Sequence, residues 1–418
     1  MSKTVNIPKG YKQSQLGLIP EEWESIRLDE ICEMRNGYTP SKANVEYWTN
    51  GDIPWFRMED IRTNGHILRD SIQHITRSAV KGSLFSANSI IISTTATIGE
   101  HALLIVDSLA NQQFTNLKIR ESLKDKVLID FFYWYCFLIG DWCRKNINEG
   151  GLQSVNMREF ERLTVLVPPL AEQRKIAEVL STWDKAIELQ TAIIDKLTLR
   201  KKGLMQQLLT GKKRFKGFFE PWRLLALGCL SERITRKNID RCSDVVTVSA
   251  QQGFVRQTDF FEKTIASDNT DNYYLVKRDE FCYNKSYSLG YPMGAIKRLK
   301  DFEEAVVTTL YIVFRVKETE LSLEFFEQYC ECGLMNKGLL KVANEGGRAH
   351  GLLNVTPKDF FSLNMIIPDI SEQKAIADVL VYADNEIEKE KQKLAALKQQ
   401  KKGLMQQLLT GKKRVITK

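Results

Sequence analysis

The sequence repeats itself at a fixed distance of 200 residues (401 − 201). The fourteen residues KKGLMQQLLTGKKR at 201–214 recur unchanged at 401–414. Upstream of them, VPPLAEQRKIAEVLSTWDKAIEL at 167–189 aligns without a gap with IPDISEQKAIADVLVYADNEIEK at 367–389. Repetition at a fixed distance marks a duplicated structural unit, so we expect the chain to contain the same unit twice.

Each copy of the repeat has the pattern of one long helix. Its apolar residues recur at alternating steps of four and three, the 3.5-residue period of a coiled-coil seam. The first copy predicts a helix over 171–209, which would be about 58 Å long. Gly211 and Gly411 are typical helix stops, and Asp369 with Glu372 resembles a capping box. The predicted seam consists of Ile176, Leu180, Trp183, Ile187, Ile194, Leu197, Leu204 and Leu208 in the first copy and of Ile376, Leu380, Ile387, Leu394, Leu397, Leu404 and Leu408 in the second.

Two long helices with such similar seams most simply pair with each other. An antiparallel pair lets the chain pass from the first helix through a globular domain into the second helix without travelling back along the helix length. The alternative is that each amphipathic helix packs separately on its own domain. We favour the antiparallel coiled coil.

The segments outside the helices are two domain-sized blocks with similar ends. IPEEWESIRLDEI at 19–31 resembles FFEPWRLLALGCL at 218–230, and NEGG occurs at 148–151 and again at 344–347. In both blocks, short apolar runs typical of strands mix with longer helical stretches. We therefore predict an α+β fold with two pseudo-repeated mixed α/β domains separated by two long helices that form an antiparallel coiled coil. The predicted segments are 1–167, 168–212, 213–367 and 368–418.

Charge and loop composition favour a nucleic-acid partner. The net charge is +8 and the isoelectric point is near 8.9, which favours a polyanion without establishing one. The predicted loops hold many side chains of the kinds that read base edges or bind phosphates. For each of them, a solvated surface residue is the alternative interpretation. The candidates for DNA contacts are Tyr38, Arg57, Thr94, Thr95, Gln112, Gln113, Gln153, Gln251, Asn284, Lys285, Tyr287, Arg348 and His350.

The sequence contains no catalytic or metal-binding motif that we recognise. It lacks GxxxxGK[ST], HExxH, GxSxG and NPPY-like stretches, and its eight cysteines and four histidines lack zinc-ligand spacing. We expect no catalysis, no metal and no cofactor on this chain. No apolar run approaches the about 20 residues that span a bilayer, and the N-terminal segment lacks the apolar core of a signal peptide. We therefore expect a cytoplasmic protein with no membrane partner.

These motifs resemble those of the specificity (S) subunit of Type I restriction–modification systems. The similar stretches are GLIPEEWE at 17–24, NGYTPSK at 36–42, GDIPWF at 51–56, PPLAEQRKIAEVL and SEQKAIADVL at the helix starts, and KKGLMQQLLTGKKR at the helix ends. The resemblance extends over essentially the whole chain.

The resemblance implies a function and a set of partners. Residues 1–167 and 213–367 would be target recognition domains, each reading one half of a bipartite sequence in double-stranded DNA. Residues 168–212 and 368–418 would be conserved helical regions that dock two methyltransferase (M) subunits. Restriction (R) subunits would join that complex. The chain itself would be non-catalytic, with S-adenosylmethionine and ATP bound only by partner subunits, and the methyltransferase would flip out an adenine to methylate N6.

Two other functions stay open at this point. One is a non-catalytic coiled-coil scaffold or adaptor with globular protein-binding ends. Sequence-specific, salt-dependent DNA binding in the presence of methyltransferase subunits would exclude it. The other is a stand-alone methyltransferase, against which the missing motifs count.

Overall fold

The computed structural model describes residues 7–148, 153–239, 242–260, 270–343 and 352–416. It divides into two compact units. Unit 1 contains residues 1–190 and 393–418, and unit 2 contains residues 191–392. Each unit therefore combines one globular domain with the first part of one long helix and the last part of the other.

The globular domain of unit 1 is built around a five-stranded sheet in the order β4-β11-β8-β9-β6. Strand β8 has the sequence SIIIS and is buried at every position. Ile90 and Ile92 pack in one hydrophobic core and Ile91 in another, because a strand covered on both faces is apolar without alternation. The strands are β1 (Tyr11–Ser14), β2 (Gly17–Pro20), β3 (Glu24–Arg27), β4 (Cys32–Asn36), β5 (Ile53–Phe56), β6 (Ile67–Leu68), β7 (His74–Ile75), β8 (Ser89–Ser93), β9 (His101–Leu104), β10 (Leu109–Ala110), β11 (Phe114–Ile119) and β12 (Thr164–Val167).

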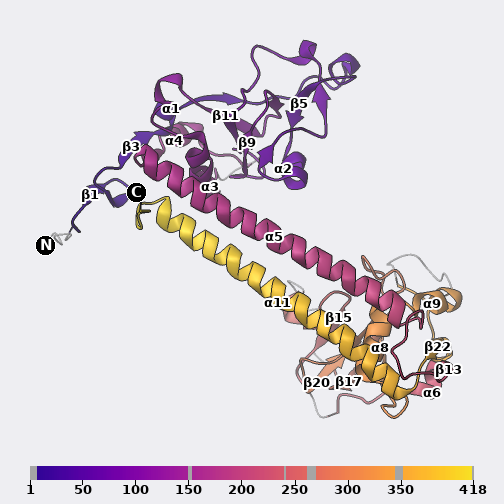
Figure 1. Ribbon diagram of the computed structural model, residues 1–418. Helices are drawn as coiled ribbons and strands as arrows, with labels where there is room; N and C mark the ends of the chain where they lie inside the picture. Colours follow the sequence, from indigo (N-terminus) through magenta and orange to yellow (C-terminus); the bar gives the residue numbers. More distant parts are fainter. Residues whose placement is uncertain (1–6, 149–152, 240–241, 261–269, 344–351, 417–418) are drawn as a thin grey trace. The chain divides into compact units, whose positions relative to one another are not determined.

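Short helices and smaller sheets complete unit 1. Strands β10, β5 and β7 form a second sheet, β1 and β2 form a hairpin, and β3 pairs with β12. Figure 1 shows β3 and α3 beside the start of α5. The helices are α1 (Leu28–Ile31), η1 (Val45–Tyr47), α2 (Met58–Asn64), η2 (Arg77–Ala79), η3 (Glu121–Leu123), α3 (Ile129–Lys145) and α4 (Met157–Glu161).

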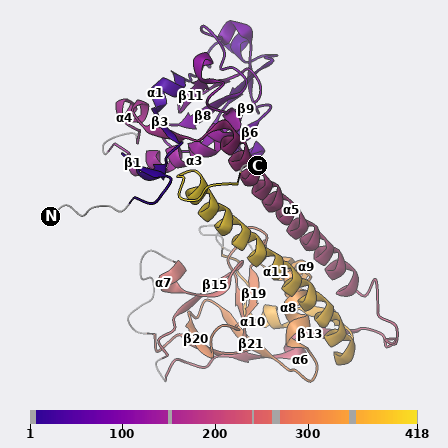
Figure 2. The ribbon, with the colours of Figure 1, turned by 60° about the vertical axis from the view of Figure 1, so that its left-hand side comes forward.

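Unit 2 repeats the central sheet. Its order β14-β21-β18-β19 matches β4-β11-β8-β9 in both chain order and pairing, and β13 pairs with β22 as β3 pairs with β12. The strands are β13 (Arg223–Ala226), β14 (Ser231–Ile234), β15 (Val246–Ser249), β16 (Gly253–Arg256), β17 (Tyr274–Lys277), β18 (Phe281–Asn284), β19 (Ala295–Arg298), β20 (Glu304–Val307), β21 (Ile312–Val316) and β22 (Asn364–Ile367). The helices are α6 (Leu227–Leu230), α7 (Gln257–Phe260), α8 (Leu323–Glu331), α9 (Asn336–Val342) and α10 (Pro357–Phe361). Figure 2 shows α8 beside α11.

The two long helices are α5 (Leu170–Leu208) and α11 (Ile370–Leu408), each of 39 residues. In unit 1, Arg414 binds Glu172 near the start of α5, whereas Lys401 binds Asp184 further along it. The residue number on one segment falls as the number on the other rises, so the two segments run antiparallel. In unit 2, the ion pairs Arg214–Glu372 and Lys201–Asp384 have the same order. The predicted antiparallel orientation is confirmed within each unit.

The residues of the predicted seam are all buried or half-buried, and Ile176, Leu180, Ile376 and Leu380 are at most 1% exposed. Gly211 and Gly411 have φ of 69° and 71°, so the predicted glycine stops adopt the left-handed conformation that ends many helices.

The predicted capping box at the start of α11 is half wrong. The carboxylate of Asp369 accepts hydrogen bonds from the N–H groups of Ser371 at 2.9 Å and Glu372 at 3.1 Å, so Asp369 does cap the helix. The Glu372 side chain does not return to the cap. It binds Arg214 and Trp222 instead, because a buried carboxylate is stabilised by charged and N–H partners.

Candidate nucleic-acid interface

A buried glutamine joins each globular domain to its long helix. Gln173 and Gln373 are both fully buried. The Gln173 Oε1 atom accepts a hydrogen bond from the N–H of Leu128, just before α3, at 2.8 Å. Gln373 Oε1 accepts one from the N–H of Ser322, just before α8, at 2.9 Å. The glutamine of each Glu-Gln motif therefore supplies a partner for a free N–H group at the start of the domain helix.

The glutamate of the same motif binds the end of the other long helix. Glu172, 2% exposed, accepts a hydrogen bond from the indole N–H of Trp23 at 2.9 Å and lies 2.8 Å from the guanidinium of Arg414. Unit 2 repeats this arrangement with Glu372, Trp222 and Arg214. Charge-assisted hydrogen bonds to a desolvated carboxylate are among the stronger polar contacts in proteins.

A second internal repeat, not found in the sequence analysis, lies in α3 and α8. IDFFYWYC at 129–136 matches LEFFEQYC at 323–330, a distance of 194 residues (323 − 129). The Tyr135 hydroxyl accepts a hydrogen bond from the N–H of Leu166 at 3.0 Å, and Tyr329 is the residue of α8 that corresponds to Tyr135. The spacing of these paired aromatic residues is the signal that could have revealed the helices as equivalent.

In unit 1, loops that follow β8 and precede α4 and β11 meet. The N–H of Thr94 donates to the carbonyl of Gln113 at 3.0 Å, and the carbonyl of Thr94 accepts from the N–H of Val155 at 2.9 Å. Thr95 and Ser154 form an antiparallel bridge. The predicted residues Thr94, Thr95 and Gln113 are therefore brought together. Gln153 joins them, because its carbonyl accepts a hydrogen bond from the N–H of Ala96 at 3.2 Å.

Side chains link the same loops to β4. The Thr115 hydroxyl donates to the Asn36 amide oxygen at 2.9 Å and lies 3.1 Å from the Thr94 hydroxyl. Because Thr94 is only 6% exposed, its side chain holds the loops together. The more exposed Thr95, Gln112 and Gln153 are better placed to meet a ligand.

Unit 2 builds the equivalent loop with different residues. The carbonyl of Lys285 accepts a hydrogen bond from the N–H of Leu353 at 3.0 Å, and Ser286 forms an antiparallel bridge with Leu352. These contacts match those of Thr94 and Thr95. The two threonines of unit 1 are therefore replaced by Lys285 and Ser286 on the same backbone framework.

Lys285 is a predicted DNA-contacting residue whose pKa is lowered by partial burial. Its side chain is half-buried, and desolvation lowers its pKa below the ordinary lysine value. Asn284 beside it donates to the carbonyl of Val248 at 2.8 Å. A partly desolvated ammonium gains from an anionic or hydrogen-bond-accepting partner. A DNA phosphate is anionic, and the O6 and N7 atoms of a guanine edge accept hydrogen bonds.

Other predicted residues have structural contacts. The Tyr38 hydroxyl donates to the carbonyl of Ala79 at 3.2 Å. Arg57 lies 3.0 Å from Glu59, although its Nε atom is buried without a hydrogen-bond partner in the described part of the chain.

Further predicted residues lie at or near the loop surface. Gln112 accepts a hydrogen bond from Thr39 at 2.5 Å, Gln251 donates to the carbonyl of Leu289 at 3.0 Å, and Tyr287 is 62% exposed. Arg348 and His350 lie outside the described residues. DNA contact by any of the predicted residues stays a prediction.

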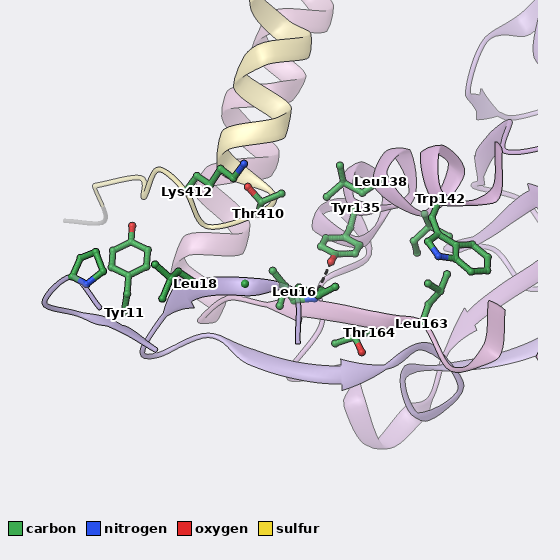
Figure 3. A pocket seen from close by; sticks show the side chains of 14 residues that line it. Tyr11, Leu16, Leu18, Tyr135, Leu138, Trp142, Leu163, Thr164, Thr410 and Lys412 are labelled. Carbon is green, nitrogen blue, oxygen red and sulfur yellow. Dashed lines mark hydrogen bonds between the residues drawn. The ribbon is translucent and has the colours of Figure 1, made fainter. Parts of the chain in front are cut away.

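Unit 1 also contains an apolar pocket of about 830 Å³ at the end of α11. Figure 3 shows Leu16 and Leu18 of the N-terminal hairpin, Tyr135 and Trp142 of α3, and Lys412 around it. The pocket lies among elements that join the domain to the helices.

The sequence matches a known protein family. A family model described as the Type I restriction modification DNA specificity domain matches residues 20–199 and 248–399. The chain belongs to this family.

Individual members of the Type I specificity family match to different extents. The EcoprrI specificity subunit of Escherichia coli is 46% identical over 181 residues, which cover 41% of this chain and 45% of that protein. The MjaVIII specificity subunit of Methanocaldococcus jannaschii is 25% identical over 430 residues, covering 95% of this chain and 94% of that protein.

Solved structures support the fold of a Type I specificity subunit. The S subunit from M. genitalium has a TM-score of 0.51 at 15% identity and covers 93% of this chain and 96% of its own. A chain from a structural study of complex assembly in the type I R-M system has a TM-score of 0.58 at 14% identity, covering 94% of this chain and 99% of its own.

The described residues offer neither a metal site nor a reactive thiol among the buried cysteines named below. No group of three or more His, Cys, Asp or Glu is arranged to hold a metal ion in that part of the chain. Burial raises the pKa of Cys136 and Cys282 well above the ordinary thiol value, which disfavours the reactive thiolate. No helix within the described ranges is long and apolar enough to cross a membrane.

Proposed function

We propose that this chain reads a bipartite DNA sequence, one half with each globular domain, and directs methyltransferase and restriction subunits to it. The observation that carries the proposal is the pair of equivalent loops described above. They have the same backbone pairing but present Thr94-Thr95 in unit 1 and Lys285-Ser286 in unit 2. Different side chains on one framework are what two half-sites of different sequence require, since base edges are read by side-chain chemistry.

The contacts between domain and helix support a division of labour within each unit. Glu172 and Gln173 make the same contacts in unit 1 as Glu372 and Gln373 make in unit 2. The junctions are thus constant while the loops differ. We assign DNA reading to the loops and docking of a partner common to both halves to the helical regions.

The identical segments carry exposed residues that the fold alone does not require. Leu208, Leu209 and Arg214 have packing or ionic roles, but Lys212 and Lys213 are exposed. The same residues at 412 and 413 are exposed as well. Identical solvent-facing residues in two otherwise different halves fit two copies of one partner, and we propose that this partner is the methyltransferase subunit.

Catalysis is assigned to the partners. We propose that the methyltransferase subunits bind S-adenosylmethionine and methylate adenine N6, that restriction subunits use ATP, and that the complex acts on DNA in the cytoplasm. The described residues of this chain offer no metal cluster.

The direct experiment is methylation by purified components. The chain alone is expected neither to methylate nor to cleave DNA. With its methyltransferase subunit and labelled S-adenosylmethionine, it is expected to direct methylation to one bipartite sequence, with binding that weakens as salt rises. Methyl transfer by the chain alone would contradict the proposal, and so would protein binding without any sequence-specific DNA binding, which is the behaviour of a scaffold.

The docking surface has its own test. Changing Lys212 and Lys213 to Glu is expected to weaken methyltransferase binding at one half, while the same changes at Lys337 and Lys341, exposed on α9, are expected to leave it unchanged. Calorimetric titration of the methyltransferase measures both. Equal binding by the two double variants would remove the repeated lysines from the interface.

A further inference from the structure

Within unit 1, a lysine of α11 contacts both α5 and the globular domain. Lys401 forms an ion pair with Asp184. Its ammonium lies 4.5 Å from the ring centre of Trp134 and 5.6 Å from that of Phe137, both on α3. Three elements therefore meet at one cation: the first half of α5, the second half of α11 and the domain helix α3.

Within unit 2, the equivalent lysine occupies an equivalent junction. Lys201 Nζ lies 2.5 Å from Asp384 Oδ1, and the other oxygen of this carboxylate accepts a hydrogen bond from the Gln328 amide on α8 at 2.7 Å. Gln328 is the counterpart of Trp134 in the α3–α8 repeat. The domain helix is thus held by a cation–π contact in one unit and by a hydrogen bond in the other.

Both lysine side chains are largely buried, so their ion pairs lie away from bulk solvent. Their side chains are 14% exposed at Lys401 and 15% at Lys201. An ion pair in such surroundings is screened less than one at an open surface. It also fixes rotation, because the carboxylate, the ammonium and the domain side chain must keep one geometry, whereas apolar packing tolerates sliding.

We propose that Asp184–Lys401 and Asp384–Lys201 are positioning pairs that set how each recognition domain is oriented on its helices. They thereby determine which separation of the two DNA half-sites is accepted. The inference rests on the proposed bipartite reading. Neither pair touches DNA in this account. Each acts through the domain helix that it holds, α3 in unit 1 and α8 in unit 2.

A positioning role differs measurably from a role in stability alone. A looser domain reads the same bases but tolerates a wider range of separations, since its loops meet the groove from more than one angle. A purely structural pair, once weakened, lowers thermal stability and total activity but leaves the preferred separation as selective as before.

The experiment measures methylation of a series of DNA duplexes by the full chain with its methyltransferase subunit. All duplexes carry the same half-sites, with the gap at its preferred length or one base pair shorter or longer. For Asp184→Asn, which changes one atom of a half-exposed side chain, we expect the preference for the correct gap to fall by about tenfold, equivalent to about 1.4 kcal/mol. Asp384→Asn is expected to act likewise through unit 2.

Two variants of Lys401 test whether its charge is needed for gap selectivity. Lys401→Arg keeps the charge and the contact with the Trp134 ring, so it is expected to retain gap selectivity. Lys401→Met keeps the bulk but loses the charge and is expected to lose selectivity as Asp184→Asn does. Lys398→Met, at an exposed position on the same helix, serves as the matched control and should behave as the unaltered chain.

The outcomes separate the two hypotheses. If the unaltered chain shows no bipartite site, the proposed function fails. If it shows one, and the Asn and Met variants keep its gap selectivity whether or not their melting temperature falls, the positioning inference is overturned. Broadened selectivity in Asp184→Asn and Lys401→Met with selectivity retained in Lys401→Arg supports it.

Discussion

The guanidinium of Arg414 lies 2.8 Å from Oε2 of Glu172, although 242 residues separate them in the sequence. The same carboxylate holds the indole N–H of Trp23. Arg414 is the last residue of the repeated segment that begins at Lys401, and its counterpart Arg214 binds Glu372. The end of each long helix is thus tied to the start of the other by the final arginine of the repeat.

Removal of this carboxylate is expected to destabilise one unit. Glu172→Ala leaves the Trp23 N–H buried without a partner and Arg414 without its counter-charge, at a cost of about 1–3 kcal/mol. Urea unfolding of the full chain, monitored by tryptophan fluorescence, gives the change in the free energy of unfolding. Lys413→Ala, at an exposed site in the same segment, should be nearly neutral. Equal stabilities of the two variants would show that the contact contributes nothing.

We expect the buried His101 to make the fold less stable in acid. Burial lowers its pKa from 6.5 to about 3, and the charges of nearby His66 and Arg144 act in the same direction. Between pH 6.5 and about 3, the unfolded chain therefore binds a proton at this residue and the folded chain does not. The contribution of His101 to the free energy of unfolding decreases as the pH falls through this range. The slope is about 1.4 kcal/mol per pH unit at most.

The measurement is thermal unfolding as a function of pH. His101→Phe is expected to flatten the acid limb of the curve, because phenylalanine cannot bind the proton. His74→Gln is the control, since His74 is partly exposed and pairs with Asp70. A curve with undiminished slope in His101→Phe would assign the acid sensitivity to other groups.

We expect a change at Lys285 to affect DNA binding at one half-site. Lys285→Ala should leave the fold intact and weaken binding of the assembled complex to DNA. If the ammonium reads a base, base changes at its position in one half-site should no longer weaken binding. The discrimination between the correct and a wrong base at that position should fall by about 1–3 kcal/mol. If it binds phosphate, the loss is similar for all sequences and the salt dependence shrinks. Titration of labelled DNA at several salt concentrations distinguishes these cases, and unchanged affinity would remove Lys285 from the interface. Arg348→Ala, directly after the NEGG segment at 344–347, is the parallel change.

The long helices predict the separation of the half-sites. One heptad inserted between Ile187 and Leu204, and a second between Ile387 and Leu404, keeps the 3.5-residue seam in register and lengthens each helix by about 10 Å. The same half-sites should then be methylated with a gap longer by about one to three base pairs. Sequencing of methylated DNA reads the gap. Altered half-sites with an unchanged gap would show that the helices do not set the spacing.

The helices could be predicted because their signals are local and periodic. The seam from Ile176 onward and the stop at Gly411 follow from spacing and backbone preference alone. The role of Glu372 could not be predicted in this way, since its partner Arg214 approaches only when the two helix segments pair. A capping box is the nearest local explanation, and it is wrong for the Glu372 side chain although Asp369 does cap the helix.

The loops with the predicted DNA-contacting residues are predictable in residue type but not in arrangement. The sequence predicts Thr94 as a DNA-contacting loop residue, yet its side chain is buried against Thr115. The equivalence of Thr95 and Ser286 is visible only through bridges to segments far along the chain, Ser154 and Leu352. Such long-range backbone pairing leaves no periodic trace in either segment.

We propose that one non-catalytic chain reads two separate half-sites, one with each unit. Mapping of N6-methyladenine across DNA from cells that express this chain with its methyltransferase tests it most directly. We expect a single motif with two short defined halves and a non-specific gap of roughly 5–8 base pairs. In the Lys285→Ala variant, only the half read by unit 2 should lose definition if this side chain reads a base. A continuous motif without a gap, or methylation that is independent of this chain, would show that the two units do not read separate half-sites.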